Sequence, residues 1–252
     1  VSTAANFSTI QKDGSGTWTL TRSGAAGISG TSIALNAGTL IADSGSLSGN
    51  VASIAGSVLQ FSQTVTGTYA GVISGGGSVV KAGGGLLTLS NSNSYTGGTT
   101  VSAGALKLGV QDALPNGGDL IVNGGVVDLN GTIQAVGTLS GAGGSIALNG
   151  IPGAAQPCQQ VACLVPIGSS LLTINSAVNS TLFSLISGSG NLIKAGSGTL
   201  NLVATNTYTG WTEVSAGKLN VTGSIAASHI FVDSGASLSG TGTVGAVTVA
   251  SG

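Results

Sequence analysis

The stretch Lys81 to Gly109 reads K-A-G-G-G-L-L-T-L-S-N-S-N-S-Y-T-G-G-T-T-V-S-A-G-A-L-K-L-G. A second copy, K-A-G-S-G-T-L-N-L-V-A-T-N-T-Y-T-G-W-T-E-V-S-A-G-K-L-N-V-T, runs from Lys194 to Thr222. The two copies superpose without a gap, so that Tyr95 coincides with Tyr208. A looser third copy, Lys12 to Leu20, matches the first third of the unit. Such self-similarity is the signature of stacked-repeat architectures.

The composition points to a β-rich chain with a regular core. Of 252 residues, 45 are glycine, while charged residues make up 5% and aromatic residues 4%. A typical globular domain has about 25% charged residues. The mean hydropathy of +0.49 does not fit a disordered chain, which combines low hydrophobicity with high charge. The chain also lacks the strict three-residue glycine period of collagen.

Short alternating segments predict strands that bury one face. In Ala105–Leu108 the apolar side chains of Leu106 and Leu108 should point inward and that of Lys107 outward. The segment Lys218–Val221 repeats the pattern, with its leucine and valine inward and its asparagine outward. No window of 12 residues shows sustained helical spacing of apolar residues, and frequent glycine disfavours helix by about 1 kcal/mol per residue relative to alanine.

Two strand arrangements fit these segments. Asn-Gly pairs at 116–117, 123–124, 130–131 and 149–150 are strong hairpin signals and favour antiparallel pairing. Tandem copies, in contrast, bury their apolar faces best by stacking like on like, and parallel crossovers are almost always right-handed. The repeat favours the second arrangement. We therefore predict an all-β, right-handed parallel β-helix of roughly 11 coils, on the order of 50 Å long.

The repeated unit closely resembles the autotransporter-associated β-strand repeat of bacterial type V secretion passengers. The frame K-x-G-x-G…Y-T-G…V-x-x-G-x-L carries this resemblance, and residues 122–130 and 239–245 look like the linking coils of such passengers. The family implies an upstream signal peptide and a downstream translocator barrel, and this sequence shows neither. We expect residues 1–252 to be an internal passenger fragment.

Residues 150–168 interrupt the pattern. This stretch holds three of the four prolines and both cysteines, Cys158 and Cys163, and it lacks alternation. Proline is poorly tolerated inside a sheet, so we expect a loop that leaves the rod. The cysteine spacing is not that of a redox or zinc motif. Because the resemblance implies an exported protein, which meets an oxidising compartment, we predict a local disulfide between them.

A search for catalytic or metal chemistry yields two weak candidates. The acids Asp112, Asp119 and Asp128 come nearest to a cluster, but a solvated role fits them better than calcium or acid–base chemistry. The single histidine, His229, has Asp233 as a conceivable orienting partner, but two residues four apart on a strand lie roughly 13 Å apart. We therefore expect no catalytic residue, no bound cofactor and no metal.

The repeated aromatic residues have two readings. Tyr95, Tyr208 and Trp211 either pack in or over the core, which we favour, or form a stripe on which sugars stack. The repeated lysines, Lys81 and Lys194, either lie outward or cap a turn carbonyl.

The function we predict is structural and non-enzymatic. A net charge of −1 gives no field that attracts nucleic acid or anionic lipid, and no apolar run approaches the roughly 20 residues of a membrane span. The resemblance implies a surface-displayed or secreted passenger stalk, whose partners would be its own translocator barrel and host-cell or matrix glycans or proteins. Two alternatives stay open: a polysaccharide-active lyase or hydrolase, and an adhesin that binds glycans through this segment.

Overall fold

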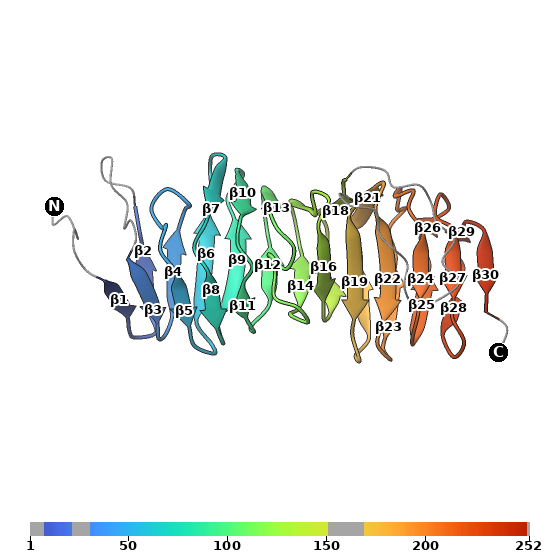
Figure 1. Cartoon of the computed structure of the whole chain (residues 1–252), viewed down its shortest axis with the longest axis horizontal. Coiled ribbons are helices and arrows are strands. Elements are labelled where there is room, and N and C mark those ends of the chain that lie inside the picture. The colour runs from blue at the N-terminus through green and yellow to red at the C-terminus, as the bar shows by residue number, and fades with distance from the viewer. Residues whose placement is uncertain (1–7, 22–30, 151–168, 251–252) are drawn as a thin grey trace.

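The chain folds into an elongated rod of stacked coils, with β1 near one end and β30 at the other (Figure 1). The computed structural model describes residues 8–21, 31–150 and 169–250. Within those ranges it contains strands and no helix, wound into about 11 coils. The predicted all-β solenoid is therefore confirmed.

The described strands form six sheets that run along the rod. Sheet I consists of β1 (Thr9–Lys12), β3 (Ser32–Leu35), β5 (Val51–Ser53), β8 (Ile73–Gly75) and β11 (Ser94–Tyr95). Sheet II consists of β2 (Thr17–Thr19), β4 (Thr39–Ala42), β6 (Val58–Ser62), β9 (Ser78–Ala82), β12 (Thr99–Val101), β14 (Leu120–Val122) and β17 (Leu139–Ser140). Sheet III consists of β7 (Gly67–Tyr69), β10 (Leu86–Leu89), β13 (Ala105–Leu108), β15 (Val126–Asp128), β18 (Ser145–Leu148) and β21 (Leu185–Gly188).

The remaining sheets belong to the second half of the rod. Sheet IV consists of β16 (Ile133–Val136), β19 (Leu171–Asn175), β22 (Asn191–Ala195), β24 (Thr212–Val214), β27 (Ile230–Val232) and β30 (Val247–Val249). Sheet V consists of β20 (Ser180–Leu182), β23 (Thr199–Leu202), β25 (Lys218–Val221) and β28 (Ser237–Ser239), and sheet VI of β26 (Ser224–Ile225) and β29 (Thr243–Val244).

Strand pairing is parallel throughout these sheets, and each pair joins one coil to the next. Val79 lies opposite Thr99, 20 residues later, and Leu192 lies opposite Thr212 at the same separation. The hairpin interpretation of the Asn-Gly pairs is therefore wrong, because the described strands before and after each pair belong to different sheets and do not pair with each other. The right hand of the coil stays a prediction.

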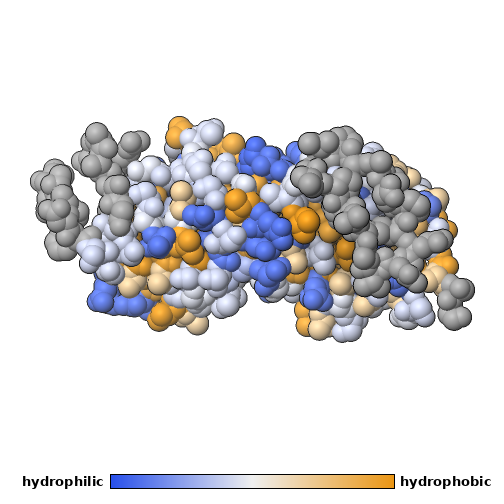
Figure 2. Space-filling view, viewed as in Figure 1, coloured by the Kyte–Doolittle hydropathy of each residue, from blue (hydrophilic) through white to orange (hydrophobic). Residues whose placement is uncertain are grey.

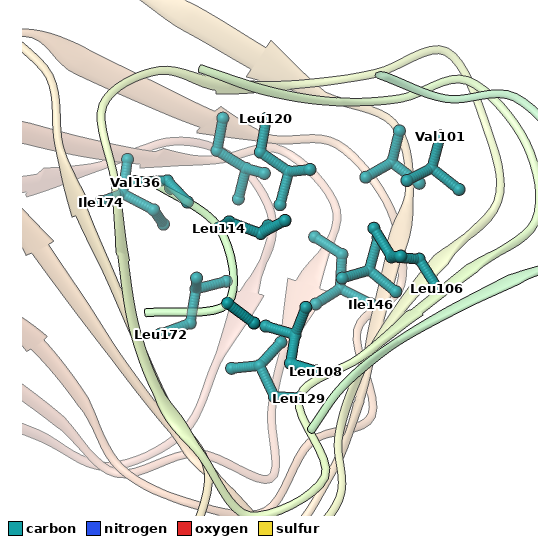
Figure 3. Close-up of a cluster of buried hydrophobic side chains, with 14 of the residues drawn as sticks. Val101, Leu106, Leu108, Leu114, Leu120, Leu129, Val136, Ile146, Leu172 and Ile174 are labelled. Carbon is teal, nitrogen blue, oxygen red and sulfur yellow. The ribbon is translucent and has the colours of Figure 1, made fainter. Parts of the chain in front are cut away.

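The inward side chains form a continuous apolar seam along the rod. Leu106 and Leu108 are buried, whereas Lys107 between them lies on the outer row, as the alternation predicts. Leu89 and Leu202, which hold equivalent repeat positions, are 1% and 0% exposed. Figure 3 shows how successive coils fill this interior, with side chains from Val101, Leu106, Leu108, Leu114, Leu120, Leu129, Val136, Ile146, Leu172 and Ile174.

Side-chain amides complete the stacking where strand pairing is interrupted. Sheet I ends at β11 and sheet IV begins at β16, and the intervening residues Ala113 and Leu114 belong to no strand. The buried Asn93 donates from Nδ2 to the Ala113 carbonyl oxygen at 2.6 Å. The buried Gln134 donates from Nε2 to the Leu114 oxygen at 2.9 Å and accepts from the Leu114 N–H at 3.0 Å. Buried backbone groups thus keep partners at this junction.

The register also locates the predicted loop. Ile133 lies opposite Leu171, 38 residues later, which is nearly twice the usual separation. The additional residues include 151–168, which lie outside the described part of the chain, as do Cys158 and Cys163. The predicted disulfide between these cysteines and the shape of the excursion stay predictions.

Candidate functional site

The most distinctive polar feature of the rod is a buried lysine at the start of each repeat. Lys81 is fully buried in β9, on the same inward row as Val79. Its Nζ atom donates three hydrogen bonds to backbone oxygens, those of Ala82 (2.9 Å), Gly83 (2.8 Å) and Ala103 (3.0 Å). Ala103 belongs to the next coil, so one ammonium group joins two coils. We call this arrangement the lysine cradle.

Lys194 and Lys12, which start the other two repeats, form the same cradle. Lys194 donates to the oxygens of Ala195 (2.7 Å), Gly196 (2.8 Å) and Ala216 (3.2 Å). Lys12 donates to those of Asp13 (3.1 Å), Gly14 (2.6 Å) and Ala37 (3.0 Å). Of the two expectations for Lys81 and Lys194, the outward orientation is therefore wrong, and the capping of turn carbonyls is confirmed. The two-residue alternation could have predicted the inward orientation, since each lysine stands two residues after an inward apolar side chain.

The glycine of the V-S-A-G motif gives the cradle its room. Gly104 adopts a φ of +68°, a conformation that other residues rarely adopt. A Cβ atom at this position would lie 2.4 Å from the Gly83 oxygen and 2.8 Å from the Lys81 Nζ atom. Gly217 has the corresponding φ of +65° in the second full repeat. The sequence pattern K-x-G…A-G therefore corresponds to the lysine cradle and the glycine that leaves room for it.

Burial makes the charged form of the cradle lysines less favourable. Removal from water lowers the pKa of the Lys81 and Lys194 ammonium groups, because a charged group loses hydration there. Three charge-assisted hydrogen bonds to carbonyl oxygens offset part of this cost. No acidic side chain takes part in the hydrogen bonds described for these two lysines. The backbone itself is the counterpart of the cation.

The repeated tyrosines lie inside the rod. Tyr95 and Tyr208 are both 0% exposed, and their hydroxyls bond to the Oγ1 atoms of Thr99 and Thr212, at 2.5 Å in each case. This burial corresponds to the packing interpretation. Trp211 is 8% exposed, and its N–H group on the backbone donates to the Asn191 side chain at 3.0 Å. A sugar-stacking stripe on the tyrosine rings would need these rings to leave the core.

Inward asparagines form a second repeated link between coils. Asn93 and Asn206 occupy equivalent repeat positions and are buried. Asn93 accepts from the Ile73 N–H, 20 residues earlier, at 2.7 Å, and Asn206 accepts from the Ile186 N–H at 2.8 Å. Asn206 also donates to the Ser224 oxygen of the following coil at 3.1 Å. These two asparagines could not be predicted from the sequence, because an asparagine in a turn-rich chain is typical of a turn.

The first full repeat also borders a surface hollow of 360 Å³. Its lining comes from Asn93, Ser94, Tyr95, Thr96, Asp112 and the turn Pro115–Gly118. The hollow follows from coil length. Thr99 and its partner Leu120 are 21 residues apart, whereas the corresponding Thr212 and Ile230 are 18 apart. The longer coil supplies the turn that stands over the hollow.

The three candidate acids do not converge. Asp112 lines the hollow, but the carboxylate of Asp119 accepts from the Thr138 N–H at 2.9 Å. Asp128 accepts from the Asn130 N–H at 2.9 Å and from the Asn149 amide at 3.3 Å. Across residues 8–21, 31–150 and 169–250, no group of three or more His, Cys, Asp or Glu side chains is arranged to hold a metal ion.

His229 and Asp233 flank β27 and have different partners. The His229 ring stacks on Phe231 with centroids 4.5 Å apart, and its Nε2 atom lies 2.9 Å from the Thr248 hydroxyl. Asp233 interacts with Glu213 of the preceding coil. Burial raises the pKa of the Glu213 carboxyl, and the charge of Asp233 and a hydrogen bond to it raise it further. The structure therefore pairs the two carboxyl groups with each other.

The cradle recurs in segments that match a known repeat family. The passenger-associated-transport-repeat family matches residues 10–42, 79–108 and 192–221. The chain thus contains three segments that are similar to this repeat. Each matched segment contains one cradle lysine together with the alanine of the next coil that accepts its bond. The lysine cradle is thus the structural element that the three repeats share.

Two relatives are much longer than this chain. The chain is 37% identical over 157 residues to the Adhesin BmaC autotransporter of Brucella suis biovar 1 (strain 1330), an alignment that covers 60% of this chain and 4% of that protein. It is 49% identical over 65 residues to an extracellular serine protease of Serratia marcescens, covering 26% of this chain and 6% of that protein. The chain thus spans only a small part of either relative. No solved structure matches it.

The resemblance to autotransporter passengers is therefore confirmed by the repeat family and by a relative that is itself named an autotransporter. No helix that is long and apolar enough to cross a membrane occurs among the described residues.

The lysine cradle makes a prediction about stability. Replacing Lys81 by methionine keeps an unbranched side chain of similar length but leaves the carbonyl oxygens of Gly83 and Ala103 without their ammonium donor. We expect Lys81→Met to lower the free energy of unfolding by about 1–3 kcal/mol. The control Lys107→Met, on the outer row, should change it by less than about 0.5 kcal/mol. Urea unfolding followed by circular dichroism compares the two, and a Lys81→Met variant as stable as the control would contradict the role of the cradle.

The tyrosines make a prediction about alkaline pH. The chain has three tyrosines, Tyr69, Tyr95 and Tyr208, and all are buried. Burial raises the pKa of Tyr208 to about 12, although hydrogen bonds to Thr212 and Ser228 lower it, and burial also raises the pKa values of Tyr69 and Tyr95. Because the folded pKa values are raised, their contribution to stability is complete below the unfolded value near 10 and is lost as pH rises above it.

Spectrophotometric titration of tyrosinate should therefore show little ionisation near pH 10 while the β-sheet circular dichroism signal persists. Ionisation and loss of that signal should occur together at higher pH. A tyrosine that ionises reversibly near its ordinary pKa in the folded rod would contradict the burial of these hydroxyls.

Proposed function

We propose that this chain is a stalk segment of an autotransporter passenger, a structural module displayed outside the cell. The observation that carries this proposal is the coincidence of the repeats with the architecture: the three segments similar to the passenger-associated-transport repeat form coils of one continuous parallel rod. A rod of this kind separates whatever lies at its two ends and keeps them in a fixed relation. That is a mechanical function, and it needs no reacting group.

The stacking suggests how such a segment folds during secretion. In the described part of the chain, each strand pairs only with strands of the adjacent coils. A coil that has formed therefore offers an edge on which the next coil can be built, so folding can advance coil by coil as the chain emerges. The lysine cradle supports this order, because its ammonium group binds two carbonyls in its own coil and one in the following coil. The translocator barrel of the same polypeptide would be the partner in this process.

A non-enzymatic role fits the polar groups of the rod. The carboxylates of Asp119 and Asp128 are acceptors for N–H groups of turns. The match to the extracellular serine protease covers only 6% of that relative, so it carries no catalytic assignment to this segment.

Direct adhesion is a second candidate, supported by the relative named as an adhesin. On the face in Figure 2, hydrophilic and hydrophobic residues are interspersed along the described part of the rod. The hollow beside Asp112 adds a concave feature whose lining includes Asn93, Asp112 and Asn116. Host-cell or matrix glycans or proteins would be the ligands of such a surface.

The stalk proposal predicts surface exposure. An antibody raised against the folded chain should label intact cells of the producing bacterium, and protease added to intact cells should remove the label. A periplasmic protein released only by permeabilisation is the matched control. Labelling that requires permeabilisation would contradict the proposal. Incubating the purified chain with immobilised glycans and host-cell surfaces separates the two candidates, because saturable binding favours adhesion and its absence favours a support role alone.

A further inference from the structure

The four Asn-Gly pairs do not form hairpins, and their surroundings differ in a way that has a chemical consequence. An asparagine followed by glycine can cyclise, because the backbone nitrogen of the glycine attacks the side-chain carbonyl carbon of the asparagine. Glycine has no Cβ atom to hinder this approach. The attack requires that the glycine nitrogen lose its proton and approach the side chain, so a hydrogen bond from that N–H group to a fixed acceptor opposes it.

The pair Asn116-Gly117 is free of such restraints. Both residues are exposed, and a Cβ atom built on Gly117 would have no heavy atom within 4 Å. The hydrogen bonds of the described residues include none from the Gly117 N–H group and none to the Asn116 side chain. The turn is closed instead by the Gly118 N–H, which donates to the Pro115 oxygen at 3.1 Å. Asn116 therefore combines the reactive sequence with open space.

Two other pairs have the same sequence but are held in place. The Gly124 N–H donates to the Val101 oxygen at 3.2 Å, and the Asn123 side chain accepts from Ala142 at 3.3 Å. Asn130 is tied from both sides as well. The Gly131 N–H donates to the Asn149 oxygen at 2.7 Å, and the Asn130 amide donates to the Leu108 oxygen at 3.2 Å. Asn149 precedes Gly150, which borders the undescribed residues, so the comparison rests on the other three pairs.

We propose that Asn116 is a modification site at which the folded protein spontaneously converts asparagine to aspartate and isoaspartate. The Gly117 nitrogen forms a bond to the Asn116 Cγ atom, the Cγ–NH₂ bond breaks, and ammonia leaves with the proton from the Gly117 nitrogen. Water then opens the cyclic imide at either carbonyl, which gives a carboxylate in both products. No oxidant, reductant or enzyme is needed.

The products change the hollow that Asn116 lines. Each adds one negative charge on the rim of a hollow that already contains Asp112. Isoaspartate also routes the main chain through the side-chain carbon, which lengthens the turn that the Pro115 oxygen and the Gly118 N–H close. The modification thus alters both the charge and the shape of this surface feature. It does not depend on the proposed stalk function.

The test compares folded and unfolded protein. The purified chain is kept at mildly alkaline pH below its unfolding temperature, then digested, and the sites of deamidation are located by mass spectrometry. We expect Asn116 to react at least about tenfold faster than Asn123 and Asn130 in the folded chain, since local opening limits the protected sites. In denaturant the three sites should react at similar rates, because each precedes glycine.

Two variants complete the test. Asn116→Gln, which cyclises far more slowly, should lower the amount of isoaspartate that an isoaspartyl methyltransferase labels in the folded chain, whereas Asn123→Gln should leave that label unchanged. Circular dichroism checks that both variants keep the β-sheet signal of the parent. Equal rates at Asn116 and Asn123 in the folded protein, or an equal loss of label in the two variants, would overturn the proposal.

Discussion

The rod depends on parallel pairing between each coil and the next, a pairing that satisfies the backbone of the strands but not that of the turns. Carbonyl oxygens at the corners lack a strand partner, and a buried carbonyl without a donor is costly. The lysine cradle supplies donors to such carbonyl oxygens. Lys12, Lys81 and Lys194 each place an ammonium group among three such oxygens, two in the same coil and one in the following coil. A cation takes an inward position here because the surrounding backbone is rich in acceptors.

The architecture was predictable because tandem copies and two-residue alternation point to the same arrangement. The inward orientation of Leu106 and Leu108 followed directly from the alternation, and the structure confirms it. For Lys81, in contrast, two sequence features predict opposite orientations of the side chain. Its position on the row of Val79 predicts an inward side chain, but charge argues for an outward one. The inward ammonium group is stabilised by two acceptors of its own coil and by one acceptor of the next coil, the Ala103 oxygen, which lies 22 residues away in the sequence.

The surface features were less predictable because they depend on small differences in coil length. The hollow beside Asp112 exists because one coil has three more residues than its counterpart in the other full repeat. The role of Asn93 and Gln134 was equally hard to predict, because their side chains bond to the backbone of Ala113 and Leu114 at the place where sheet I gives way to sheet IV. The free amide of Gly117 likewise follows from the turn at Pro115 rather than from the Asn-Gly sequence, which recurs elsewhere in the chain.

A support function follows naturally from this construction. Its stabilising contacts, which are backbone pairing, the inward apolar seam and the cradle, repeat along the rod and face inward. The outward rows are then free to vary, with few charges and many short polar side chains. Autotransporter passengers that carry such repeats can therefore differ on the surface while keeping one interior plan.

The central claim is that successive coils stack in parallel and in register, and a distance between spin labels tests it most directly. Thr68 and Ser187 lie on one row of sheet III and are joined through Thr88, Lys107, Asp128 and Ala147. Five steps of about 4.8 Å place their backbones roughly 24 Å apart. In a variant whose native Cys158 and Cys163 are replaced by serine and whose only cysteines are the two labelled ones, pulsed electron paramagnetic resonance should give a single distribution near that distance, and moving the first label from Thr68 to Thr88 should shorten it by one step. A distance that does not shorten, or that is close to the spacing of neighbouring strands, would contradict the parallel rod.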